Sequence, residues 1–123
     1  MGMASLYRRF AVPVFWTVLA FVYAIAIMPS PDAPDLGAGD KVNHIAAFLT
    51  LSFLGRAGYR FRPVWQLAIG LSLFGALIEL TQSIPILRRD GNISDWAADS
   101  AAIIVALAIS LACERRFLVR ATA

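Results

Sequence analysis

The stretch that decides the fold is residues 10–28, which reads FAVPVFWTVLAFVYAIAIM and carries no charged side chain. A helix of about 20 apolar residues crosses the hydrocarbon core of a bilayer, so this stretch predicts a membrane-spanning helix. Three further apolar stretches follow, at residues 42–59, 65–84 and 96–112. The sequence therefore predicts an all-α fold, a single membrane domain over residues 1–123 with four transmembrane helices.

The composition of the whole chain supports a location in lipid. Of 123 residues, 59% are hydrophobic and 15% are charged, whereas soluble domains contain about 45–50% apolar and about 25% charged residues. A soluble globule of this size would need more polar residues to cover its large relative surface. The composition excludes an ordinary soluble domain, and it excludes a disordered chain because disorder requires low hydrophobicity.

The first apolar stretch has an alternative interpretation as a cleaved signal peptide, because Ala24-Ile25-Ala26 resembles a cleavage site. The apolar core of a signal peptide has about 7–15 residues, and residues 10–28 exceed that length. We therefore expect an uncleaved first helix.

The basic residues predict the orientation. If all four stretches cross, eight arginines fall on one side and three basic residues on the other. The first set is Arg8, Arg9, Arg56, Arg60, Arg62, Arg115, Arg116 and Arg120, and the second is Lys41, Arg88 and Arg89. The positive-inside rule then predicts that both termini lie in the cytoplasm. We expect the membrane to be a bacterial inner membrane.

The second stretch, residues 42–59, is the weakest of the four, because its apolar run is short and Arg56 lies near its end. If this stretch did not cross, the arginines that follow it would lie outside and the bias would disappear. We therefore expect it to span, with Arg56 extending toward the interface.

Acidic residues gather at the opposite, outer end. Seven of the eight map there: Asp32, Asp35, Asp40, Glu79, Asp90, Asp95 and Asp99. Spacings of three or four residues place Asp40 with His44, Glu79 with Gln82 and Asp95 with Asp99 on single helix faces. Because an ionisable side chain in lipid costs several kcal/mol, we expect His44, Glu79 and Asp99 to face the bundle interior or a wet cavity.

The same residues, in this order, resemble the motifs of the VanZ-like family. Residues 40–48 read DKVNHIAAF and fit Asp-Lys-x-x-His with a later phenylalanine, and residues 79–82 read ELTQ and fit Glu-x-x-Gln. Pro85 and Arg89 follow, and then Asp95 and Asp99, so that the resemblance covers about residues 40–102. It implies a small multi-helix integral membrane protein, in a family named for a member associated with teicoplanin resistance, and it implies no established reaction.

These observations predict an extracytoplasmic ligand site. Its candidate residues are Asp40, Lys41, His44, Glu79, Gln82, Arg89, Asp95 and Asp99. Arginine offers planar donors to phosphate and carboxylate, the anionic groups of envelope lipids and peptidoglycan precursors. We therefore expect contact with membrane lipids and a site for an envelope lipid headgroup or a glycopeptide-related molecule.

Other functions compete with this interpretation. In an enzyme, His44 and Glu79 would perform acid–base chemistry on a headgroup while Arg89 holds an anionic group. In a structural module, the polar cluster would only lock the bundle, and Asp40 and Asp95 would cap the helices that they precede. A proton-coupled carrier is disfavoured, because no ionisable residue lies near the middle of a span.

Several partners are not expected. One histidine and one cysteine, Cys113, exclude the usual multi-histidine metal sites and any intramolecular disulfide, so we expect neither a metal nor another cofactor. Nucleic-acid binding is not expected, because the basic residues flank helices instead of forming one face. The sequence predicts no oligomeric state.

Overall fold

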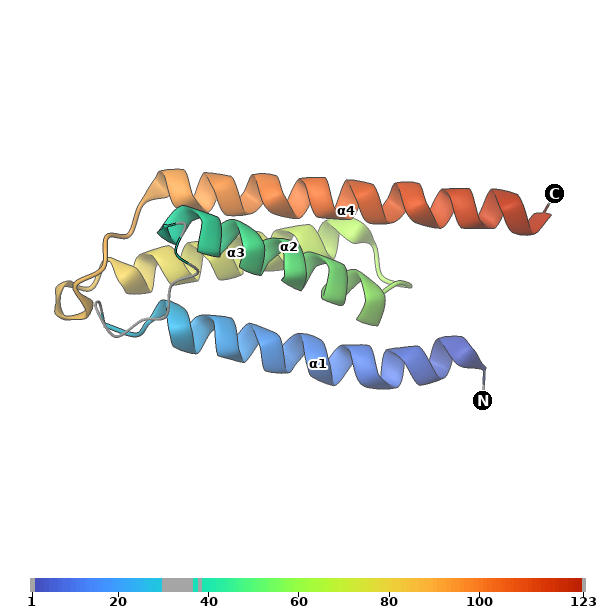
Figure 1. Ribbon diagram of the computed structural model, residues 1–123, viewed down its shortest axis with the longest axis horizontal. Coiled ribbons are helices and arrows are strands. Elements are labelled where there is room, and N and C mark those ends of the chain that lie inside the picture. Colours follow the sequence, from blue (N-terminus) through green and yellow to red (C-terminus); the bar gives the residue numbers. More distant parts are fainter. Residues whose placement is uncertain (1, 30–36, 38, 123) are drawn as a thin grey trace.

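The computed structural model describes residues 2–29, 37 and 39–122, and this part of the chain is all-helical, as predicted. Its elements are α1 (Met3–Ala26), α2 (Asp40–Gly58), α3 (Val64–Gln82), the short 3-10 helix η1 (Pro85–Leu87) and α4 (Ile93–Thr122). The four long helices form an elongated bundle in which successive helices run in opposite directions (Figure 1). Both termini lie at one end of the bundle, and the start of α2 and the α3–α4 connection lie at the other.

Three of the described helices, α1, α3 and α4, are long and apolar enough to cross a membrane. Large apolar side chains are exposed on their surfaces, among them Phe21, Leu73 and Ile104. These helices indicate a membrane protein. The helix α2 is as long as α3 but carries charged residues at both ends and is not among the three, so the predicted fourth span is not shown.

The outer helices are longer than predicted. α1 begins at Met3 instead of residue 10, and α4 runs from Ile93 to Thr122 instead of from residue 96 to 112. The prediction marked apolar runs that fit within lipid, whereas the helices continue through charged segments because arginine and glutamate are good helix formers. The other helix ends differ from the predicted ones by a few residues.

The helix α2 lies in the middle of the packing, with its most extensive contacts to α1 and α4. Its buried residues recur every three or four positions: His44, Phe48, Leu51, Ser52, Gly55 and Gly58. This spacing gives the helix one continuous buried face. Phe48 and Leu51 join the hydrophobic core with residues from the other three helices, which include Phe15, Leu71, Ile78, Ile103 and Leu107.

Arg56 forms an ion pair with Glu114 on α4. Its guanidinium donates two hydrogen bonds to the Glu114 carboxylate, Nε to Oε1 at 2.9 Å and Nη2 to Oε2 at 2.7 Å. This pair depends on the length of α4, which continues past the predicted end and brings Glu114 alongside α2. The ion pair fastens the end of α2 to α4.

Candidate functional site

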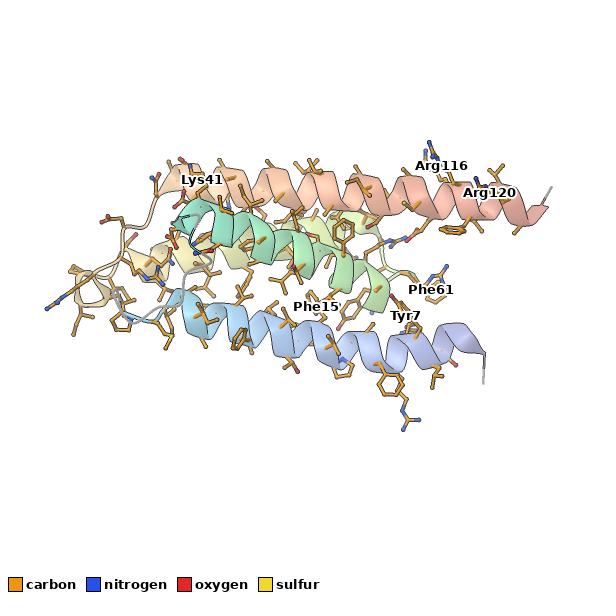
Figure 2. All side chains as sticks on the ribbon, viewed as in Figure 1. Tyr7, Phe15, Lys41, Phe61, Arg116 and Arg120 are labelled. Atoms are coloured by element: carbon orange, nitrogen blue, oxygen red, sulfur yellow. The ribbon has the colours of Figure 1, made fainter. Side chains whose placement is uncertain are left out.

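The eight predicted site residues come from the start of α2, the end of α3, the α3–α4 connection and the start of α4. Figure 2 shows Lys41 at this end of the bundle and Arg116 and Arg120 near the other. The structure therefore brings the predicted residues to one polar end. Asp32 and Asp35, expected at the same end, lie outside the described residues.

The start of α4 is positioned by Asn92. Its side-chain oxygen accepts a hydrogen bond from the backbone N–H of Ser94 at 2.9 Å, so Asn92 caps the helix. Its own backbone N–H donates to Glu79 Oε2 at 2.7 Å, which ties the end of α3 to the start of α4. Asp95 is therefore not the cap but lies in the first turn. Asp40 is the first residue of α2, after Gly39 at φ +94°, and the start of this helix has no side-chain cap among the described residues.

The centre of the site is a buried contact among three helices. His44 Nδ1 lies 3.3 Å from Asp99 Oδ2 and 3.4 Å from Glu79 Oε1. The exposed fractions are 7% for His44, 8% for Glu79 and 0% for Asp99. As predicted, these residues face the bundle interior. Glu79 Oε1 and Asp99 Oδ1 find no hydrogen-bond partner among the described residues.

Arg89 donates hydrogen bonds to backbone carbonyl groups at the end of α1. Its Nε donates to the Met28 carbonyl at 3.0 Å, its Nη2 to the Ile25 carbonyl at 3.2 Å, and its Nη1 to Asp40 Oδ1 at 3.3 Å. These bonds satisfy carbonyl groups that a helix leaves unpaired at its C-terminus. The other Asp40 oxygen, Oδ2, lies 3.9 Å from His44 Nε2. Arg89, Asp40 and His44 thus form a connected row.

Lys41 and Gln82 connect the site to the surrounding helices. Lys41 Nζ donates to Ser94 Oγ at 2.5 Å and lies 3.3 Å from Asp95 Oδ1, joining α2 to α4. Gln82 Nε2 donates to the Ala26 carbonyl at 3.0 Å, joining α3 to α1. The remaining Gln82 oxygen, Oε1, is buried and has no hydrogen-bond partner among the described residues.

A cavity of about 370 Å³ lies mainly between α1 and α2 and reaches this polar end. Along its length it is lined mainly by apolar side chains, which include Val18, Phe21, Val22, Ile25, Ala46, Ala47, Phe48 and Ile78. At one end its lining is polar and consists of Asp40, Asn43, His44, Gln82 and Arg89. The lining does not include Lys41, Glu79, Asp95 or Asp99, so the eight predicted residues divide between the cavity and the protein interior.

Sequence reasoning missed several residues at this end. Asn92 follows a glycine and precedes an apolar run, which is a signal for a helix cap that could have identified it. Gly75 carried no such signal, yet a side-chain carbon there would lie 3.3 Å from both Asp99 Oδ2 and Phe48 Cζ. The α1 carbonyls that bind Arg89 and Gln82 belong to the backbone, so no side-chain motif could reveal them.

The arrangement offers two kinds of chemistry. The cavity combines apolar walls with a polar end formed by carboxylate, imidazole, amide and guanidinium groups, which suits an amphipathic ligand. The buried cluster combines one imidazole with two carboxylates, which suits proton transfer or cation binding. Comparison of the chain with protein-family models, with curated proteins and with solved structures finds no match.

Proposed function

We propose that the chain is a VanZ-like integral protein of a bacterial inner membrane, with four spans and cytoplasmic termini, that binds a phospholipid between α1 and α2. Pairing of the charges on α2 supports its role as the fourth span. Asp40 pairs with Arg89, Lys41 with Asp95 and Arg56 with Glu114. Paired charges lower the free-energy cost of placing this helix in the membrane.

The proposal of a lipid ligand rests on the cavity between α1 and α2. Its volume of about 370 Å³ is within the range of small-molecule sites. Its apolar walls suit an acyl chain, and its polar end lies where α1 ends. If α1 crosses the bilayer, this end stands near the level of the lipid headgroups, which suits a lipid with its headgroup among Asp40, Asn43, His44, Gln82 and Arg89.

The polar end also suggests the type of headgroup. Gln82 Oε1 is a buried acceptor that needs an N–H or O–H donor. Arg89 donates three hydrogen bonds to protein groups, and guanidinium has five N–H donors, so two N–H groups can contact a phosphate. A headgroup with both a phosphate and a donor satisfies both requirements. Phosphatidylethanolamine has both, and phosphatidylcholine has the phosphate without the donor.

A lipid competition experiment tests this function. The purified protein is reconstituted with equal amounts of phosphatidylethanolamine and phosphatidylcholine, and the lipid retained on delipidation is identified by mass spectrometry. We expect the wild type to retain phosphatidylethanolamine preferentially, by about tenfold, because an unpaired buried acceptor costs about 1–3 kcal/mol. Gln82→Leu should remove this preference, and Arg89→Ala should reduce the retention of both lipids.

Arg88 provides the matched control, because it is exposed in the connection beside Arg89. Its φ of +49° favours asparagine as the replacement, so Arg88→Asn should retain lipid as the wild type does. Equal retention of both lipids by the wild type would contradict the proposal and would mean that the cavity holds an ordinary lipid chain without recognition of its headgroup.

Acid–base chemistry on the bound headgroup is a second candidate function. It is favoured by the position of His44, which lines the cavity and contacts Glu79 on its other side. The same mass spectra would then contain a lipid product of changed mass that is absent with His44→Ala. Unchanged lipid in every sample would contradict this candidate and leave binding alone.

A further inference from the structure

His44, Glu79 and Asp99 form a buried cluster of which only His44 lines the lipid cavity. The three residues come from α2, α3 and α4, and one donor atom from each lies within 4.8 Å of the other two. The set contains one nitrogen and two oxygen donors, which together are typical metal ligands. We propose that this cluster binds a divalent transition-metal ion, with Zn²⁺ and Mn²⁺ as the ions that its donors suit.

Hydrogen bonding alone does not satisfy the cluster. Charge-assisted N–H···O bonds are about 2.7–2.9 Å long, whereas His44 Nδ1 lies 3.3 Å and 3.4 Å from the two carboxylates. A single Nδ1–H cannot donate well to both. Glu79 Oε1 and Asp99 Oδ1 are buried and find no hydrogen-bond partner among the described residues, so carboxylate acceptors remain unfilled.

Two of the three separations between donor atoms fit coordination. Zn²⁺ binds imidazole nitrogen and carboxylate oxygen at about 2.0–2.2 Å, which places neighbouring ligands of a tetrahedral ion about 3.4 Å apart. His44 Nδ1 therefore already stands at ligand spacing from Glu79 Oε1 and from Asp99 Oδ2. Three protein ligands leave a position open for water or another ligand.

The pairing of charged residues around the cluster also favours a bound cation. Lys41 pairs with Asp95, and Arg89 pairs with Asp40. The carboxylates of Glu79 and Asp99 are left to share His44 at the buried centre, and even a protonated histidine balances only one of them. A divalent cation balances both and leaves the imidazole neutral, the form in which it binds metals.

Neighbouring residues lie against the His44 ring nitrogen and the Glu79 oxygen that do not face the cluster. Asp40 Oδ2 lies 3.9 Å from His44 Nε2, on the side of the ring away from Nδ1, and Arg89 in turn holds Asp40. The Asn92 N–H donates to Glu79 Oε2 and leaves Oε1 turned to His44. A carboxylate behind a ligating histidine fixes its orientation and tautomer.

Metal binding to the full-length protein in detergent tests this proposal. After chelation and buffer exchange, Zn²⁺ and Mn²⁺ binding is measured by equilibrium dialysis with elemental analysis, and Co²⁺ is added as a spectroscopic probe. We expect one ion per chain and visible Co²⁺ absorption bands. Asp99→Asn should weaken binding by about tenfold or more, because it replaces an anionic ligand by a neutral amide, and loss of a hydrogen-bond partner behind a ligand already costs that much.

Asp90→Asn is the matched control, because it makes the same replacement of an aspartate by asparagine outside the cluster. Asp90 is exposed in the α3–α4 connection and lines neither the cluster nor the cavity. It should retain wild-type affinity within about twofold. The proposal is overturned if the wild type binds neither ion stoichiometrically, a result that requires no variant to fold. Equal weakening in both variants would also overturn it, with helix content and elution volume checked in each.

Discussion

At the scale of single residues, the bond between Arg56 and Glu114 gives a direct test of how α2 is held. Its geometry is bidentate, and the Arg56 side chain is 11% exposed while that of Glu114 is 33% exposed. Exposed ion pairs contribute about 0.2–1 kcal/mol, and hydrogen bonds to charged groups contribute about 1.5–3 kcal/mol. This half-buried pair should therefore contribute about 1–2 kcal/mol to the free energy of unfolding.

The measurement is a double-mutant cycle with Arg56→Gln and Glu114→Gln, followed by unfolding in mixed micelles. The exposed Arg116 lies on the same helix as Glu114, and Arg116→Gln should leave the stability unchanged within about 0.5 kcal/mol. A coupling energy near zero would show that solvent screens the pair, and the attachment of α2 to α4 would then depend on apolar packing.

At the scale of elements, the contact between α1 and α2 depends on a close approach of their backbones. A side-chain carbon on Gly58 would lie 3.1 Å from Val12 Cγ2 and 3.4 Å from the Val12 backbone nitrogen, which cannot move independently of α1. Gly70 on α3 has no atom within 4 Å of the same position among the described residues. The two helical glycines therefore form a matched pair.

We expect Gly58→Leu to lower the free energy of unfolding by about 1–3 kcal/mol, because the added side chain separates α1 from α2. Gly70→Leu should leave stability unchanged or raise it by up to about 1 kcal/mol, since leucine is a better helix former than glycine. Thermal unfolding in detergent followed by circular dichroism measures both. Equal melting temperatures for the two variants would contradict the close approach.

At the scale of the whole molecule, sequence predicted the helices and the polar end but not the contacts within it. Runs of apolar residues revealed the helices because lipid demands such composition. The alternating helix direction then brought His44, Glu79 and Asp99 to one end. His44 lies between two carboxylates because each helix is rotated about its axis by a particular amount. The packing of residues such as Phe48 and Gly75 determines that rotation. The partner of Arg56 was hidden because the apolar run of α4 ends before Glu114.

The orientation of the bundle gives a prediction for the complete protein, tested by cysteine accessibility in intact cells. Cys113 is first replaced by serine, and single cysteines are introduced as Arg60→Cys between α2 and α3 and as Asp90→Cys before α4, both at exposed positions. If all four helices cross from a cytoplasmic N-terminus, an impermeant maleimide labels position 90 from outside. It labels position 60 only after the membrane is permeabilised.

The proposal of four crossings rests on the packing more than on hydropathy. Helices α1, α3 and α4 are apolar enough to span, and α2 lies among them, in contact with all three (Figure 1). We expect a helix so placed to share the depth of its neighbours, because its terminal charges are paired within the bundle. If α2 instead stayed on the outer side, position 60 would be labelled in intact cells and position 90 would be protected. That reversed pattern would also move Arg56, Arg60 and Arg62 outside and remove the bias of the positive-inside rule. The two labelling patterns exclude each other, so one pair of cysteines decides whether the least apolar helix crosses the membrane.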